Sequence, residues 1–136
     1  MYEYFDHTAD LGLRITATTF EDLLAEAGFA LFSTLVENLS GVKPQREVTV
    51  EIVQANPVWL FFDWLTELLF LFESRHLLLC QFQIQFCDSK MTAICRGDSF
   101  CPKNNLQKHE IKAITYHELK VEQNEGNWIA EVILDI

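Results

Sequence analysis

The chain has 136 residues, 49% of them hydrophobic, and a formal net charge of −10 at pH 7. This length suits one domain with a substantial core and is short for two, so we expect a single domain over residues 1–136. The negative charge argues against direct binding to nucleic acid through a basic face, because phosphates would be repelled. It favours cations, or partners that present a basic surface.

The expected cellular compartment follows from the absence of a secretory signal and of a membrane-spanning segment in the sequence. Its first residues carry neither the basic region nor the apolar run of a secretory signal. The densest apolar stretch, VWLFFDWLTELLFLF at 58–72, contains Asp63 and Glu67 and falls short of the roughly 18 apolar residues of a membrane span. We therefore expect a cytoplasmic protein without a membrane segment. Its four cysteines should be reduced, and Cys101 should be the most exposed of them.

The first predicted element is a short strand or two around the polar segment FDHTADLGL at 5–13. This segment brings His7, Thr8 and Asp10 together next to Gly12. Three interpretations are open: a simple turn, half of a metal or catalytic site, or a surface that another macromolecule recognises. A turn aspartate that bonds its own backbone is the common structural alternative for Asp10.

Two helices are predicted next, with a strand between them. Apolar residues recur at helical spacing in TTFEDLLAEAGFALFSTLVE, at 18–37, where Thr18 and Glu21 have the spacing of a capping box. The alternation in REVTVEIV, at 46–53, is typical of a strand. Asn56 then caps a second helix that has Pro57 at its first position and runs to about Arg75.

The last third of the chain is rich in strand signals. Turn residues at 88–90 and 124–127 separate segments of β-branched and aromatic residues, which indicates antiparallel neighbours. We therefore predict the α+β class: a mostly antiparallel sheet with two helices packed on one face, as a two-layer sandwich. The predicted core between the layers is Leu23, Leu24, Ala27, Leu31, Leu60, Trp64, Leu68 and Leu71.

Few residues stand out as catalytic. The chain has neither a Gly-x-Ser-x-Gly elbow nor a glycine-rich phosphate loop. His117 shares its strand parity with Leu119 and Val121, which favours a satisfied, half-buried histidine over a metal ligand.

Acidic residues are more informative. Asp63 and Glu67 lie one helical turn apart, which suits a solvated face or, alternatively, a bound cation that offsets their repulsion. Asp135 stands at the end of a predicted strand beside Ile136, whose terminal group would add a second negative charge. Oxygen ligands of this kind suit calcium, magnesium or manganese better than zinc.

Four segments, taken in order, resemble the archease family. They are HTADLG at 7–12, WLFFDWLTELLFLFE at 59–73, HEIKAITYHELKVE at 109–122 and WIAEVILDI at 128–136. The resemblance implies an activator of the GTP-dependent tRNA-splicing RNA ligase, which joins a 3′-phosphate or 2′,3′-cyclic phosphate end to a 5′-hydroxyl end. The activator would promote guanylylation of the ligase and its multiple turnover, without being an enzyme itself.

The resemblance also implies a divalent-metal site. Its ligands would fall on Asp10, Asp135 and Ile136, with Asp63 and Glu67 as further candidates and with calcium favoured over manganese or magnesium. His7 and Thr8 would then hold Asp10 in place.

Two other function classes stay open. One is a metal-dependent phosphoester hydrolase that uses the same acids, against which the missing nucleophile counts. The other is a general chaperone-like protein that binds exposed basic or apolar surfaces.

Overall fold

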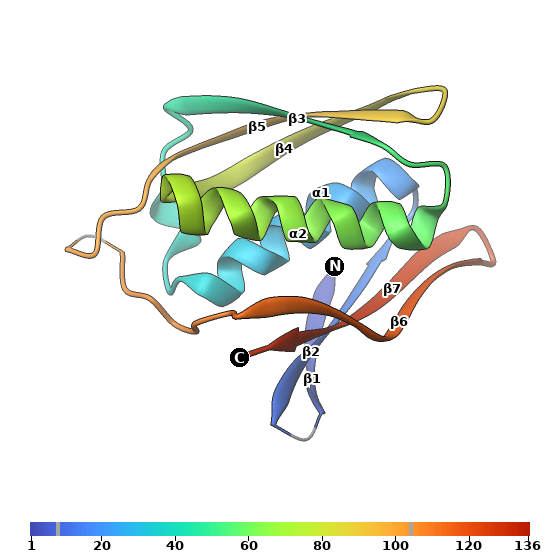
Figure 1. Cartoon of the computed structure of the whole chain (residues 1–136), viewed down its shortest axis with the longest axis horizontal. Coiled ribbons are helices and arrows are strands. Elements are labelled where there is room, and N and C mark those ends of the chain that lie inside the picture. Colours follow the sequence, from blue (N-terminus) through green and yellow to red (C-terminus); the bar gives the residue numbers. More distant parts are fainter. Residues whose placement is uncertain (8, 104) are drawn as a thin grey trace.

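The computed structural model describes residues 1–7, 9–103 and 105–136 (Figure 1). Thr8 therefore lies outside the described residues, and the prediction made for it is not tested. The elements in chain order are β1 (Tyr2–His7), β2 (Asp10–Ala17), α1 (Phe20–Leu35), the 3-10 turn η1 (Leu39–Gly41), β3 (Arg46–Val53), α2 (Pro57–Arg75), β4 (Leu77–Cys87), β5 (Lys90–Ser99), β6 (Ala113–Asn124) and β7 (Asn127–Asp135).

The described strands form two antiparallel sheets. One has the order β1-β2-β7-β6 and the other the order β3-β5-β4. The helices lie between them, so that α1 packs on β4 from one side and on β2 from the other (Figure 1). The α+β class with antiparallel strands and packed helices is confirmed. The prediction had one sheet in two layers, whereas the strands are divided between two sheets with the helices in between.

Packing of the helices explains why a second sheet is needed. Buried residues of α1 include Leu23, Leu24, Ala27, Phe32 and Thr34, which do not lie on one stripe. A helix that is apolar on most sides must be covered on more than one side. All eight predicted core residues are buried. The indole Nε1 of Trp64 donates a hydrogen bond to the carbonyl of Leu24 at 2.8 Å, which joins the two helices.

The helix starts follow ordinary capping chemistry. Asn56 caps α2 as predicted, since its Oδ1 accepts hydrogen bonds from the amides of Val58 (2.9 Å) and Trp59 (3.2 Å). The prediction for α1 is wrong by one residue: Thr19, not Thr18, is the N-cap, and its hydroxyl accepts from the amide of Asp22 at 3.0 Å. No helix among the described residues has the length and apolarity required to cross a membrane.

Strand β6 departs from regular pairing. Thr115 lies opposite Ile133 and Lys120 opposite Glu131, so residues 116–119 correspond to the single residue Val132 of β7. Within this insertion, called the β6 bulge (residues 116–119) below, Glu118 has a left-handed backbone with φ 55°. Non-glycine residues seldom adopt this conformation. The bulge therefore redirects side chains that a regular strand would alternate between its two faces.

All four cysteines are free, which agrees with the prediction. The prediction that Cys101 is the most exposed is wrong, because Cys87 is exposed while Cys101 is half-buried. Cys87 ends β4 at a hairpin turn, where a side chain has few neighbours. Cys95 lies in the core, and burial raises the pKa of its thiol to about 12.

Candidate functional site

Pairing of β2 with β7 brings Asp10 to Asp135. Leu11 lies opposite Leu134, and the same register continued by one residue places Asp10 opposite Asp135. Residues directly opposite each other in an antiparallel pair point to the same face, with Cβ atoms about 5 Å apart. Two half-buried carboxylates from distant parts of the sequence thus share one end of the four-stranded sheet.

The end of β7 is held on its other side by β6. The amide of Lys112 donates a hydrogen bond to the carbonyl of Asp135 at 2.7 Å, and Ala113 lies opposite Asp135. Ile136 is partly buried and packs against the core, which fixes the backbone next to Asp135.

The chemistry of this end fits a hard cation. Among the described residues, every ion pair involves acids other than Asp10 and Asp135. Two neighbouring carboxylates without a basic partner repel each other, and a divalent ion coordinated by their oxygens would remove that repulsion. We call Asp10, Asp135 and Ile136 the acidic tip. That it binds a metal stays a prediction.

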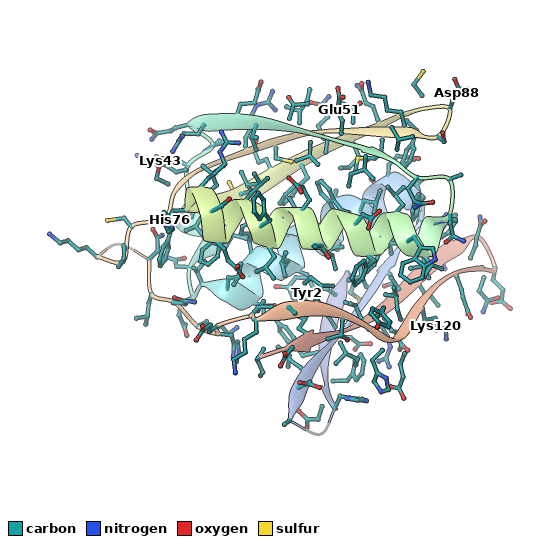
Figure 2. All side chains as sticks on the ribbon, viewed as in Figure 1. Tyr2, Lys43, Glu51, His76, Asp88 and Lys120 are labelled. Carbon is teal, nitrogen blue, oxygen red and sulfur yellow. The ribbon has the colours of Figure 1, made fainter. Side chains whose placement is uncertain are left out.

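The helix acids lie elsewhere. Asp63 and Glu67 line a groove with Thr49 and Glu51 of β3, on the side of α2 that faces the three-stranded sheet. Figure 2 shows Glu51 and Lys120 on opposite sides of the helix layer. In the described part of the chain, no group of three metal-ligating side chains includes Asp63 or Glu67, and none includes Asp10 or Asp135. The groove that Asp63 and Glu67 line contains neither Asp10 nor Asp135.

Three other side chains that could ligate a metal ion lie close together: His7, His117 and Glu118. Nε2 of His7 lies 3.1 Å from Oε2 of Glu118, and Nε2 of His117 lies 3.9 Å from Oε1 of Glu118. The two imidazole rings are 5.5 Å apart at an angle of 67°. His7 also lies opposite Asp10 in the β1–β2 pair, so this group borders the acidic tip.

Sequence reasoning missed this group for a structural reason. It predicted a half-buried His117, but that side chain is 67% exposed and the prediction is wrong. In a regular strand His117 and Glu118 would point to opposite faces. One signal was available: the buried positions change parity from Ile114 to Val121, which indicates an insertion between them.

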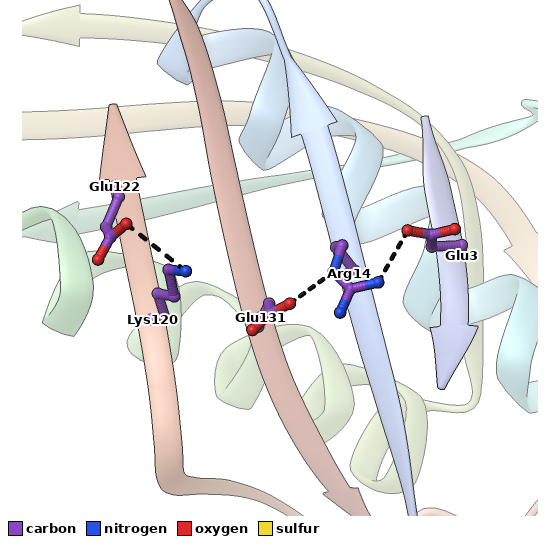
Figure 3. A network of polar contacts seen from close by, with 5 residues as sticks. All are labelled: Glu3, Arg14, Lys120, Glu122 and Glu131. Atoms are coloured by element: carbon purple, nitrogen blue, oxygen red, sulfur yellow. Dashed lines mark hydrogen bonds and ion pairs between the residues drawn. The ribbon is translucent and has the colours of Figure 1, made fainter. Parts of the chain in front are cut away.

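A row of charges supports the outer face of the same sheet. Arg14 of β2 donates hydrogen bonds to Glu3 of β1 (3.0 Å) and to Glu131 of β7, which ties three strands together (Figure 3). These hydrogen bonds, the one to Glu3 first, raise the pKa of Arg14. The Arg14 guanidinium also lies 5.1 Å from the centre of the Phe5 ring.

Gly12 lies beneath that ring. A Cβ added at Gly12 would overlap the side chain of Phe5, its partner across the β1–β2 pair. The glycine of HTADLG therefore gives the Phe5 ring room to lie over the strand next to the acidic tip.

Comparison with known proteins agrees with this architecture. The model of the Archease protein family matches residues 2–136. The archease of Methanopyrus kandleri is 37% identical, covering 99% of each chain, and that of Methanosarcina mazei is 33% identical, covering 99% of this chain and 95% of its own.

Solved structures show the same fold. The solution structure of protein 1598 of Methanobacterium thermoautotrophicum aligns with a TM-score of 0.88 at 30% identity, over 99% of this chain and 98% of that one. An archease of Thermotoga maritima, described as a possible chaperone, shares the fold with a TM-score of 0.66 at 23% identity, over 100% of this chain and 98% of its own. With its whole length matched by the family and by these relatives, the chain belongs to the archease family.

Proposed function

We propose that this chain activates the GTP-dependent tRNA-splicing RNA ligase, which joins 3′-phosphate or 2′,3′-cyclic phosphate ends to 5′-hydroxyl ends. It would promote guanylylation of the ligase and multiple turnover, and would not be an enzyme itself. The observation that carries the proposal is the family match over residues 2–136. The β2–β7 register, which ends at Leu11 opposite Leu134 and so brings Asp10 and Asp135 to the same end of the sheet, supports the proposal.

Charge supports this kind of partner. A ligase that binds RNA and GTP needs a basic active-site cleft, and a chain of net charge −10 is complementary to it. Encounter should therefore be fast and sensitive to salt. Since the acidic tip and RNA would compete for the same positive surface, the activator would act before or between ligation cycles, in the cytoplasm, without binding nucleic acid or membrane.

The acidic tip has the donors that a divalent ion needs. Asp10 and Asp135 would hold the ion through carboxylate oxygens, and Ile136 through a main-chain oxygen. A bound calcium, manganese or magnesium ion would supply positive charge next to phosphate oxygens. The chain's own residues keep the carboxylates oriented, since Lys112 holds the backbone of Asp135 and Phe5 packs over Gly12 next to Asp10.

A chaperone-like role is the second candidate, because large apolar side chains are exposed. Phe70 is 57% exposed and Tyr116 is 70% exposed, and Tyr116 is part of an aromatic group with Trp59 and Phe62. Such surfaces suit transient binding of another protein. Phosphoester hydrolysis remains a third candidate, which an assay of the chain alone with manganese would test.

The decisive experiment compares the steps of ligation. Guanylylation and multiple-turnover sealing by the ligase of the same genome are measured with and without this chain. Asp10→Ala, Asp135→Ala and deletion of Ile136 should each abolish stimulation. The matched control is the double variant Asp63→Ala and Glu67→Ala, which removes two acids from the other side of the helix layer and should keep stimulation.

Pre-guanylylated ligase should complete its first sealing reaction without this chain. Full stimulation by Asp10→Ala would contradict the proposal. An effect on sealing with none on guanylylation would contradict the proposed step.

A further inference from the structure

The group of His7, His117 and Glu118 connects strands that are not neighbours. β1 and β6 form the two edges of the four-stranded sheet, with β2 and β7 between them. Three strand spacings amount to roughly 14 Å in a flat sheet, yet Nε2 of His7 lies 3.1 Å from Oε2 of Glu118. Glu118 belongs to the β6 bulge, where the strand carries residues that have no partner of their own in β7.

The bulge presents its side chains at a conformational cost. Glu118 is held at φ 55°, a conformation that glycine or asparagine adopts more easily than glutamate. Its carboxylate is nevertheless the group that lies between the two imidazoles. Strain of this kind persists where the surroundings fix it, and it concentrates at functional sites.

His7 is not an ordinary structural histidine. Its Nδ1 is buried without a hydrogen-bond partner in the part of the chain that the structure describes. Its Nε2 lies beside Oε2 of Glu118. Buried polar atoms are usually satisfied by the fold. The Nδ1 atom thus lacks a partner among the described residues, while Nε2 already lies beside a carboxylate that could share an ion with it.

The separations are close to those of a metal centre. One ligating atom from each of the three residues lies within 4.8 Å of the others. Metal–ligand bonds of about 2.0–2.1 Å in a tetrahedral site place ligand atoms about 3.3 Å apart. His117 and Glu118 have exposed side chains, at 67% and 62%, so small rotations can close the gap. A fourth position would stay open to water or to a partner's side chain.

The donor types select the ion. Two imidazoles with one carboxylate suit zinc and similar transition metals, whereas calcium and magnesium prefer oxygen alone. We propose that His7, His117 and Glu118 bind a zinc-class divalent ion at a site separate in its ligands from the acidic tip. A bound ion would fasten the β6 bulge to the end of β1. This inference does not rest on the proposed function.

The test uses the full chain after treatment with a chelator, with zinc chloride as the probe. Calorimetry should show one zinc ion bound per chain, and zinc should raise the melting temperature. Cobalt should give the visible absorption of a tetrahedral site. His117→Ala and Glu118→Asn should each weaken zinc binding by more than about 100-fold, since even supporting residues around a metal contribute 10–100-fold.

The variants are chosen to keep the fold. His117 and Glu118 are exposed, and asparagine tolerates the left-handed conformation at position 118. His76→Asn is the matched control, since it removes an exposed histidine that is also left-handed but lies outside the group. It should bind zinc like the parent.

Two further variants test whether zinc binds instead at the exposed thiol or at the acidic tip. Zinc binding should persist in Cys87→Ser, which removes the exposed thiol, and in the double variant Asp10→Ala and Asp135→Ala. Loss of binding in Cys87→Ser, unchanged binding in both His117→Ala and Glu118→Asn, or no zinc binding by the parent chain would each overturn the proposal.

Discussion

The two sheets pack against the same pair of helices but differ in regularity and in what they expose. In the three-stranded sheet, β3 pairs with β5 without a register shift from Arg46 to Val53, and β4 shifts its pairing with β5 once, between Leu79 and Gln81. Apart from Cys87 at the hairpin, the exposed positions of β4 carry glutamines. The four-stranded sheet contains the β6 bulge and gathers His7, Asp10 and Asp135 at one end. The three-stranded sheet thus mainly supports the helix layer, while the larger insertion in the four-stranded sheet positions chemically active groups.

The largest effect should come from the layer that both sheets share. Leu24→Ala and Leu68→Ala should each lower the free energy of unfolding by about 2 to 5 kcal/mol, because both side chains are fully buried and truncation leaves a cavity. Chemical denaturation would measure this loss. Variants within about 0.5 kcal/mol of the parent would contradict the assignment of a common core.

Calcium should distinguish the acidic tip of the four-stranded sheet from the groove between α2 and β3. At a concentration 100-fold above its dissociation constant, a ligand of the folded state stabilises it by about 2.7 kcal/mol. Calcium should stabilise the parent chain by that amount, and a chelator should remove the effect. The double variant Asp10→Ala and Asp135→Ala should lose it, whereas Asp63→Ala with Glu67→Ala should keep it. Equal stabilisation of the two double variants by calcium would contradict a calcium site at the acidic tip.

Gly12→Ala should damage the four-stranded sheet alone. The new methyl group would overlap the ring of Phe5, and overpacking of this kind costs about 1–3 kcal/mol. The double variant Gly12→Ala and Phe5→Leu should recover part of the loss. Hydrogen exchange should show weaker protection in β1 and β2 than in β3 and β5, and a uniform change in both sheets would contradict this explanation.

Cysteine labelling compares the core with a hairpin turn. The pKa of Cys95 is raised to about 12 by burial, so only about one thiol in ten thousand is ionised at pH 8. Cys87 should react first with a thiol reagent, and Cys95 only after unfolding. The raised pKa also predicts that the contribution of Cys95 to stability is complete below the unfolded value near 9.0 and is lost as the pH rises toward 12. Denaturation of Cys95→Ala across this range would show a smaller decline.

The smallest expected effect is a difference in melting temperature between variants of two equally exposed arginines. Arg14 and Arg96 both have side chains that are 39% exposed, but Arg14 pairs with Glu3 and Glu131, whereas among the described residues Arg96 pairs with one acid, Glu47. Arg14→Ala should therefore lower the melting temperature slightly more than Arg96→Ala. High salt should reduce the difference, since exposed charges are screened. Equal shifts would show that the charge row in Figure 3 adds no stability.

Much of the fold could be predicted from the sequence. Helical periodicity and the capping residue correctly predicted that α2 begins at Pro57. The alternation of apolar and polar residues predicted the bounds of β3, because these signals are local. Alternation identifies strands but not their partners, so the division into two sheets was not predicted. The exposure of Cys87 was missed for a similar reason, since it depends on which strands lie beside the hairpin.

The candidate site was predictable only in part. The resemblance pointed to Asp10 and Asp135, and the observed register, which ends at Leu11 opposite Leu134, brings them to the same end of the sheet. His117 and Glu118 were missed because their convergence depends on an insertion in β6 and on the backbone of Glu118. A local sequence pattern does not specify such a conformation, apart from the change of parity between Ile114 and Val121.

The position of β7 has a consequence for the order of synthesis. β7 lies between β2 and β6, so the N-terminal hairpin gains its inner neighbour only when residues near Leu134 have left the ribosome. Until then β2 exposes an unpaired edge that another chain could pair with. Pairing across so long a stretch of chain is also slow. The helices and the three-stranded sheet can assemble earlier, and the acidic tip would form last, after translation of almost the whole domain.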